Sequence, residues 1–342
     1  MAIGRPLSSE SGLILINKPR GITSFGVVSR LRKLTGVRRI GHTGTLDPFA
    51  DGLLPVCVGR ATSIVQFMDG YDKTYRLGIE FGRATNTQDL TGLSVFEHVL
   101  TETEKDSLRA TDFAVLRQAV AALPGEHDQM PPMFSAIKID GRPLYEYARR
   151  GEEIERKRRR IRIDQAIIES IELDDVLRAV IVIACSKGTY IRTIADDLGR
   201  CLGFGAHAVT LTRLKCGPFQ LEQAVDIEQL FSWREEYPDQ AAFVAFLRQS
   251  GWLTSIDRAF SDFPSLNMPV ETAIRLINGQ PLVFDKKEIA KWAEQLPEMN
   301  TKTVIYSNDS LIGIASLKPE SADRIQIKTE RVLIDLEDFR QS

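Results

Sequence analysis

Two strand-like segments follow each other so closely along this chain that no helix fits between them. They cover residues 161–171 and 178–185, and the second is apolar enough for a buried strand. Parallel neighbours in a sheet need a crossover of roughly a dozen residues or more, so we expect these two to pair antiparallel. A third segment, KTYRLGIEFG at 73–82, alternates apolar and polar residues as a half-buried strand does. Together the three segments predict an α+β fold with a mainly antiparallel sheet.

Helical patterns lie between these strands and before them. Residues 22–36 repeat apolar side chains at helical spacing, with Thr23 or Ser24 as the N-cap and Gly36 at the end. A second helix is expected after the strand at 178–185, beyond the turn at Lys187 and Gly188. The sequence therefore combines helices and antiparallel strands in one unit.

The C-terminal third of the chain has a different pattern. Residues 226–252 are expected to be helical, and short strands and turns follow from about residue 253. The clearest is 303–317, where two apolar runs around Ser307, Asn308 and Asp309 predict a hairpin. We place a domain boundary near residues 250–253. Because no Gly/Ser-rich or Pro-rich linker occurs there, the small domain is expected to pack against the large one.

Composition places the chain among globular proteins, since 43% of its 342 residues are hydrophobic and 26% are charged. The longest uncharged apolar run, at 179–185, is far shorter than the roughly 20 residues that span a membrane. The first twelve residues, MAIGRPLSSESG, contain no apolar core of a signal peptide. The four cysteines form no CxxC pair and have no histidine at ligand spacing, which favours reduced thiols. We therefore expect a cytoplasmic protein with no membrane contact and no metal.

Positive charge is concentrated in the first two thirds of the chain. Residues 1–220 carry 31 Lys and Arg against 26 Asp and Glu, whereas residues 221–342 carry 13 against 20. The densest clusters are at 1–50 and in RRGEEIERKRRRIRI at 149–163. Such clusters can neutralise phosphates and bind nucleic acid. A solvated charged face explains the second cluster equally well, because three glutamates lie within it.

The stretch GHTGTLDPFADGLLPV at 41–56 sets a charged Asp47 between a leucine and a proline. A carboxylate in apolar surroundings is costly unless a partner compensates it. The glycines and prolines around it predict a stiff loop. His42 and Asp47 could form an acid/base pair, but Asp51 is equally near in sequence, and a structural turn explains a lone loop aspartate as well. A P-loop is excluded, because the chain has no GxxxxGK[ST].

Six long motifs occur along the chain in the order of a known family. They are LINKPRGITS, GHTGTLDPFADGLLPVCVG, KTYRLGIEFGRATNTQDLTG, PPMFSAIKIDGRPLYEYARRG, CSKGTYIRTIADDLG and LTRLKCGPF. Through them, residues 12–219 resemble the bacterial tRNA pseudouridine-55 synthases of the TruB type. From residue 252 the sequence resembles the small PUA-like domain that ends many members. The resemblance implies a pseudouridine synthase fold in a catalytic domain at 1–250 and a β-rich PUA-like domain at 251–342.

The reaction that the resemblance implies is isomerisation of a uridine in the T-arm loop of tRNA, by base flipping and without a cofactor. The base leaves its ribose at N1, turns, and is reattached through C5. By resemblance, Asp47 is the nucleophile and Arg192 of GTYIR is its partner. Tyr75 of KTYR corresponds to the tyrosine that stacks on the target base and is placed to take part in proton transfer. From the strand pattern alone, Tyr75 would be an ordinary core aromatic.

Substrate-binding roles are expected for a further set of residues, in addition to Tyr75: His42, Tyr190, Leu211, Lys18 and Arg213. By resemblance, His42 fills space among the loop bases, and Tyr190 and Leu211 contact the flipped nucleotide. Lys18 and Arg213 are suited to phosphates, and 131–151 corresponds to a mobile segment that closes over the RNA.

The expected partner is therefore the T-arm stem-loop of tRNA. We expect a monomer with no obligatory protein partner. Two alternatives stay open at this point. One is an RNA-binding or tRNA-folding factor that uses the same surface, and the other is a different aspartate-dependent enzyme such as a hydrolase.

Overall fold

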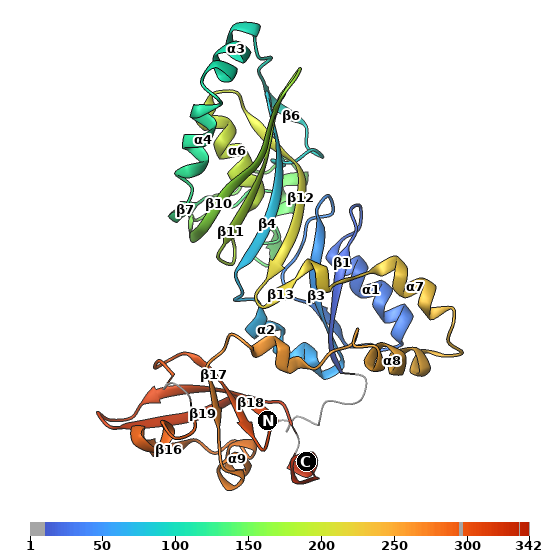
Figure 1. Ribbon diagram of the computed structural model, residues 1–342, viewed down its shortest axis with the longest axis vertical. Helices are drawn as coiled ribbons and strands as arrows, with labels where there is room; N and C mark the ends of the chain where they lie inside the picture. The colour runs from blue at the N-terminus through green and yellow to red at the C-terminus, as the bar shows by residue number, and fades with distance from the viewer. Residues whose placement is uncertain (1–10, 294–296, 335, 342) are drawn as a thin grey trace.

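Ten strands pair into one sheet that extends through most of the molecule, and a second sheet of five strands forms near the C-terminus (Figure 1). The structure is a computed structural model and describes residues 11–293, 297–334 and 336–341. The start of the chain, from which the sequence predicts no signal peptide, lies outside the described residues up to position 10. In the described ranges, no helix is long and apolar enough to cross a membrane.

The large sheet is mixed but mainly antiparallel, as the sequence predicts. In pairing order its strands are β14 (Val225–Asp226), β1 (Gly12–Lys18), β3 (Asp51–Val58), β12 (Ala206–Cys216), β4 (Lys73–Phe81), β11 (Leu177–Cys185), β10 (Arg159–Leu173) and β7 (Gly125–Gln129). Off this path, β13 (Phe219–Gln220) pairs with β12 and β2 (Ile40–His42) pairs with β3. Among these pairs, β1 with β14 and β12 with β3 are parallel. The close succession of β10 and β11 produces the expected antiparallel pair.

Strand β4 lies at the centre of the sheet, between β12 and β11. Its alternate residues Tyr75, Leu77, Ile79 and Phe81 are buried, while Arg76 is exposed. The alternation read from the sequence is therefore confirmed. It matters for function because it directs Tyr75 away from solvent and into the interior beside β12.

Helices accompany the large sheet, most of them near its two ends (Figure 1). They are α1 (Ser24–Thr35), α2 (Val65–Met68), α3 (Glu102–Ala110), α4 (Ala114–Ala121), α5 (Leu144–Arg149), α6 (Ile191–Leu202), α7 (Ile227–Arg234) and α8 (Gln240–Gln249). Helix α1 has the predicted ends, because the Thr23 side chain accepts from the Gly26 N–H and Gly36 closes the helix with φ 72°.

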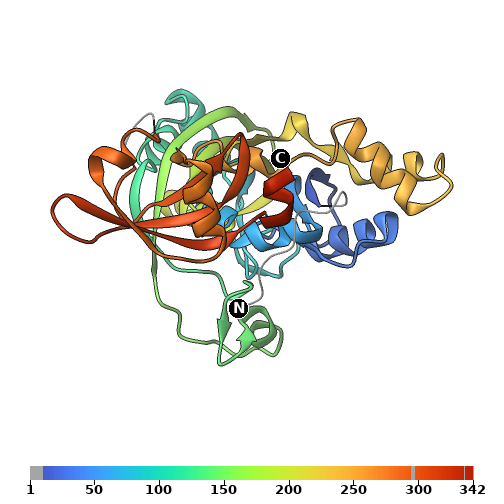
Figure 2. The ribbon, with the colours of Figure 1, turned by 90° about the horizontal axis from the view of Figure 1, so that it is seen from below.

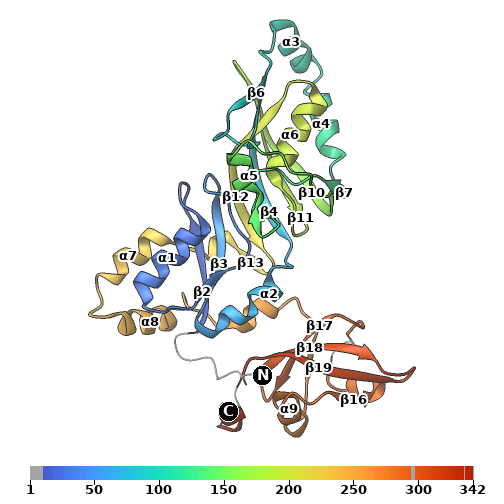
Figure 3. The same ribbon diagram turned by 180° about the vertical axis from the view of Figure 1, so that it is seen from behind.

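Two short hairpins leave the large sheet. They are β5 (Arg83–Thr85) with β6 (Ser94–Glu97), and β8 (Lys138–Ile139) with β9 (Arg142–Pro143). The second hairpin and α5 belong to the excursion between β7 and β10, residues 130–158, which projects from the sheet when seen from below (Figure 2). Seen from behind, α5 lies in front of β4 and β12 (Figure 3).

Two local predictions need correction. The stretch 41–56 is a loop only in part, because its second half is strand β3, in which Pro55 pairs opposite Leu15 of β1. The helical segment at 226–252 is two helices, since Pro238 lies in the break between α7 and α8 and a proline cannot continue a helix.

The second sheet forms the small β-rich part that the sequence predicts as PUA-like. In pairing order its strands are β15 (Ser265–Asn267), β17 (Lys302–Ser307), β18 (Ser310–Pro319), β19 (Arg324–Val332) and β16 (Leu282–Asp285). Helices α9 (Val270–Ile277), α10 (Lys286–Ile289) and α11 (Leu336–Gln341) accompany it. The predicted hairpin is β17–β18, and its turn residues Asn308 and Asp309 have φ of 48° and 58°.

The small sheet packs against the large one, as expected from the absence of a linker. One apolar cluster contains Leu13 and Leu53 from the large sheet together with Val304 and Ile314 from the small sheet. The main chains of Leu13 and Thr254 also exchange two hydrogen bonds of 2.9 Å. The two sheets therefore share part of their apolar interior.

Candidate active site

A cavity of about 740 Å³ collects residues that lie far apart in the sequence. Its lining includes six of the predicted site residues: Asp47, Tyr75, Tyr190, Arg192, Leu211 and Arg213. They come from the loop before β3, from β4, from the start of α6 and from β12. The fold thus brings together motifs from the two ends of the region that resembles the family.

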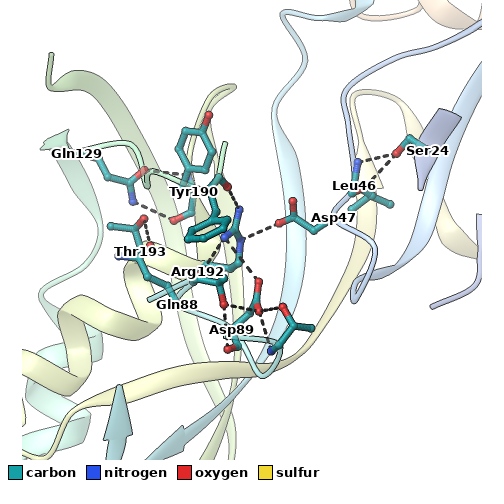
Figure 4. A network of polar contacts seen from close by, with 12 residues as sticks. Ser24, Leu46, Asp47, Gln88, Asp89, Gln129, Tyr190, Arg192 and Thr193 are labelled. Atoms are coloured by element: carbon teal, nitrogen blue, oxygen red, sulfur yellow. Dashed lines mark hydrogen bonds and ion pairs between the residues drawn. The ribbon is translucent and has the colours of Figure 1, made fainter. Parts of the chain in front are cut away.

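Asp47 lies in a loop that short-range contacts hold in place. The Ser24 hydroxyl, at the start of α1, accepts from the Leu46 N–H at 2.9 Å and donates to the Leu46 carbonyl at 3.1 Å (Figure 4). The Asp47 carbonyl accepts from the Ala50 N–H at 3.1 Å, and the Pro48 carbonyl accepts from the Gly21 N–H at 2.8 Å. These contacts fix the backbone on both sides of the carboxylate, so the Asp47 side chain is presented to the cavity from a rigid support.

Arg192 is the partner of Asp47. Its Nε donates to Asp47 Oδ2 at 2.8 Å (Figure 4). The Arg192 side chain is 4% exposed, whereas that of Asp47 is 36% exposed. The remaining nitrogens donate to the carbonyls of Thr87 at 2.6 Å and Phe134 at 2.9 Å. Because its other nitrogens are bound by carbonyls, the guanidinium is fixed in place. Its Nε can therefore orient one oxygen of the carboxylate and leave the other oxygen free.

A second carboxylate, that of Asp89, also faces Arg192, with Oδ2 at 3.6 Å from Nη1. The Oδ1 atom of Asp89 accepts from the Thr87 hydroxyl at 2.8 Å and from the Thr91 N–H at 2.9 Å. Reasoning from the motifs assigned no role to Asp89. Its signal is the pattern Thr87-x-Asp89-x-Thr91, in which neighbouring hydroxyl and N–H groups bind an aspartate in a turn.

Tyr75 and Arg213 lie opposite each other on β4 and β12 at the floor of the cavity. Burial raises the pKa of Tyr75 to about 12, so its phenol is protonated at neutral pH. Arg213 is 1% exposed, and it donates to the carbonyls of Leu53 at 2.7 Å and Gly44 at 3.2 Å. Arg213 therefore braces the loop that carries Asp47, and its buried guanidinium is less open to a phosphate than the sequence suggests.

Lys18 does not line this cavity, although it lies near enough to Asp47 for their charges to interact. Its side chain is fully buried, and the ammonium donates to the carbonyls of Pro19 and Ile22, each at 2.9 Å. Burial lowers the pKa of Lys18 to about 8, although Asp51 and Asp47 oppose this shift. These contacts make Lys18 a brace for the turn after β1, since β1 runs inside the sheet and not at its surface.

His42 lines a neighbouring cavity of about 660 Å³, which shares Gly44, Thr45 and Asp69 with the first. Burial, followed by the charge of Arg213, lowers the pKa of His42, so the imidazole is neutral at pH 7. Its Nδ1 is buried and makes no hydrogen bond within the described residues. A neutral ring beside the cavity suits contact with bases more than proton transfer.

Tyr190 and Leu211 form walls of the first cavity, and burial raises the pKa of Tyr190. In the part of the chain that the structure describes, no group of three His, Cys, Asp or Glu side chains could hold a metal ion. The four cysteines are free thiols. The cavity therefore offers the oriented carboxylate of Asp47, the buried guanidinium groups of Arg192 and Arg213, and the protonated phenols of Tyr75 and Tyr190.

Solved structures show what fold this is. A chain in a crystal structure of a Cbf5-Nop10-Gar1 complex superposes with a TM-score of 0.69, at 21% sequence identity, over 98% of this chain and 91% of that chain. At this identity the structural similarity is evidence for the fold only. The model of the TruB family pseudouridylate synthase N-terminal domain matches residues 32–191, and that of the tRNA pseudouridylate synthase B C-terminal domain matches residues 192–258. The family models thus define a pseudouridine synthase, which is an isomerase.

Curated relatives narrow the class. A tRNA pseudouridine synthase B from Photobacterium profundum is 37% identical over 337 residues, which cover 98% of each chain. One from Geobacter sulfurreducens is 45% identical over 219 residues, 64% of this chain and 68% of the relative. The chain belongs to the TruB family of pseudouridylate synthases.

Proposed function

We propose that this enzyme isomerises a uridine in the T-arm loop of tRNA, the position that gives the pseudouridine-55 synthases their name. The observation that carries the proposal is the contact of 2.8 Å between Asp47 and Arg192 at the wall of a cavity that also exposes Tyr75. The relatives at 37% and 45% identity are named for tRNA, which supports the same substrate class here.

The Asp47 carboxylate is the nucleophile in this proposal. Arg192 Nε binds one oxygen of this carboxylate, which leaves the other oxygen to face the substrate. That oxygen adds to the base or sugar, or stabilises positive charge at C1′, while the N1–C1′ bond breaks. The uracil turns, the C5–C1′ bond forms, and any covalent bond to Asp47 breaks. C5 then loses its proton and N1 gains one. No atom is gained or lost overall except by exchange of that proton with water, so the reaction needs no redox partner.

Tyr75 acts next to the nucleophile. Its ring lies at the floor of the cavity, where it can stack on the uracil, and its hydroxyl is the phenolic group available for proton transfer near C5. The raised pKa of Tyr75 keeps the phenol protonated between turnovers. Tyr190 and Leu211 confine the base from the sides.

Base flipping brings the uridine to this cavity. A uridine in a folded loop is stacked, and Asp47 reaches it only after the base has turned out of the loop. The volume of about 740 Å³ lies within the usual range for a pocket that encloses a nucleotide-sized ligand. The neutral ring of His42, beside the adjoining cavity, fills the space that the base leaves among its neighbours.

The proposal also includes the domain bounds, the cellular location and the oligomeric state expected from the sequence. The catalytic domain covers residues 1–250 and a PUA-like domain covers 251–342, and the enzyme works in the cytoplasm as a monomer without an obligatory protein partner. Within excursion 130–158, the segment 131–151 closes over the RNA, since its residues Ser135 and Lys138 line the cavity. Sedimentation of the protein alone and with a T-arm stem-loop tests the stoichiometry, and a dimer would contradict it.

Tritium release tests the reaction itself. A T-arm stem-loop labelled with tritium at C5 of uridine is incubated, without added metal, with the wild type or with the Asp47→Ala variant. We expect the label to pass into water with the wild type alone. If neither protein releases tritium while both still bind the stem-loop, the chain acts on another RNA or only binds this one.

A further inference from the structure

The side-chain amide of Gln129 holds the main chain of Tyr190, the residue just before helix α6. Gln129 is the last residue of β7 and is 7% exposed. Its Oε1 accepts from the Tyr190 N–H at 2.8 Å, and its Nε2 donates to the Tyr190 carbonyl at 3.0 Å (Figure 4). A carboxamide presents a donor and an acceptor side by side, which neither a hydrocarbon nor an ionised carboxylate does. This pair of bonds therefore depends on the residue type at position 129.

The contact anchors the start of a helix that has no side-chain cap. Tyr190 is the N-cap of α6, and its own side chain makes no capping hydrogen bond. Ser, Thr, Asp or Asn would usually supply one. Arg192 is the second residue of the helix, so the direction of its side chain depends on where the first turn begins. The backbone of that turn is thus anchored from a neighbouring strand.

The same strand end is also the base of excursion 130–158. Phe134, within the excursion, gives its carbonyl to Arg192 Nη2 at 2.9 Å. At the returning end, Arg158 donates to the carbonyl of Asp128 at 2.9 Å, next to Gln129. Gln129 therefore lies where the start of the excursion and the start of α6 meet.

We propose that Gln129 is a positioning residue for the isomerisation, which fixes the start of α6 so that Arg192 Nε meets the Asp47 carboxylate. This inference rests on the proposed roles of Asp47 and Arg192. Gln129 does not line the cavity, so its loss should lower the rate of the chemical step more than the affinity for RNA. A misplacement of about 1 Å in a catalytic group can cost about 100-fold in rate.

Substitution of the amide tests the proposal. Gln129→Met keeps the length of the side chain and removes both hydrogen bonds, whereas Gln129→Glu keeps the acceptor for the Tyr190 N–H. We expect the single-turnover rate on the tritiated stem-loop to fall about 10- to 100-fold in Gln129→Met and less in Gln129→Glu, with Kd within about twofold of the wild type. Gln118→Met, at an exposed position of α4, is the matched control and leaves the rate unchanged.

A double-mutant cycle separates positioning from general destabilisation. In an Arg192→Lys background, the compact ammonium cannot keep the forked contacts of the guanidinium. Gln129→Met should therefore lower the single-turnover rate by a factor several-fold smaller there than in the wild type. An equal loss in both backgrounds, or an unchanged rate in Gln129→Met, overturns the proposal. If Gln129→Met does not fold, by circular dichroism, Gln129→Glu carries the same cycle. A wild type that releases no tritium refutes the proposed function instead.

Discussion

Removal of the Arg192 guanidinium is expected to cost stability as well as catalysis. The substitution Arg192→Met keeps an unbranched apolar stem and leaves the Asp89 carboxylate without its counter-charge. The same change leaves the carbonyls of Thr87 and Phe134 without the donors at 2.6 Å and 2.9 Å. The side chains of Arg192 and Asp89 are 4% and 8% exposed, so water does not readily replace the lost contacts.

The size of the effect follows from which groups are buried. Breaking a buried ion pair by removing one partner costs about 3–5 kcal/mol. The Asp47 side chain is 36% exposed and can be solvated by water, so losing its ion pair contributes little to the loss of stability. Most of the loss comes from the buried Asp89 carboxylate. Because Asp89 Oδ1 keeps its bonds to Thr87 and Thr91, we expect the lower end of the range, about 3 kcal/mol.

Equilibrium unfolding in urea measures this loss. The proteins to compare are the wild type, Arg192→Met, and a double variant that adds Asp89→Asn. The asparagine needs no counter-charge, so the double variant should recover part of the stability that the single variant loses. A loss below about 1 kcal/mol in the single variant, or no recovery in the double variant, would contradict the description of Arg192 as the centre of a buried charge network.

Three further changes test separate parts of the site. Tyr75→Phe keeps the ring and should lower turnover by about 100-fold at unchanged stem-loop affinity, and wild-type turnover would reduce Tyr75 to packing. Lys18 has a folded pKa of about 8 against 10.5 unfolded, so burying its charge weakens the fold below pH 8, and this cost disappears as pH rises to 10.5. The difference of roughly 2.5 pKa units predicts that the free energy of unfolding of the wild type rises by about 3 kcal/mol over that interval relative to Lys18→Met. Urea unfolding at several pH values measures this. If stability changes with pH in the same way in both proteins, the prediction is wrong. Gly52→Ala, at φ 99° with a Cβ only 2.5 Å from the Arg213 carbonyl, should lose about 2 kcal/mol or more, while Gly279→Ala, at φ 77° in open space, should lose less.

Local patterns predict much of this fold because their causes are local. The alternation in β4 follows from one buried face, and Thr23 and Gly36 end α1 through contacts within a few residues. The burial of Lys18 could not be read in the same way, because it depends on a strand distant in the sequence, β3, in which Gly52 pairs opposite Lys18. The prediction of a loop at Pro55 was wrong for a related reason, since a proline is tolerated in β3 only through the arrangement of the neighbouring strands.

The residues of the candidate site also differ in how far they could be predicted from the sequence. The resemblance of the motifs pointed to Asp47, Tyr75 and Arg192, which the fold brings to one cavity. Asp89 and Gln129 have no such signal in isolation, because their importance comes from Arg192 and Tyr190, about 100 and 60 positions further along the chain. Partners at that separation are set by strand order and become visible only once the sheet is built.

In the proposed reaction, Asp47 is the nucleophile that isomerises one uridine in the T-arm loop of tRNA. The most direct measurement is to treat an unmodified tRNA transcript with the wild type or with Asp47→Asn and to locate pseudouridine by carbodiimide modification and reverse transcription. We expect one new stop, at the T-loop uridine, with the wild type and none with Asp47→Asn, although both proteins bind the transcript. Pseudouridine formed elsewhere in the tRNA, or formed equally by the Asp47→Asn variant, would contradict the assigned substrate position or the assigned nucleophile.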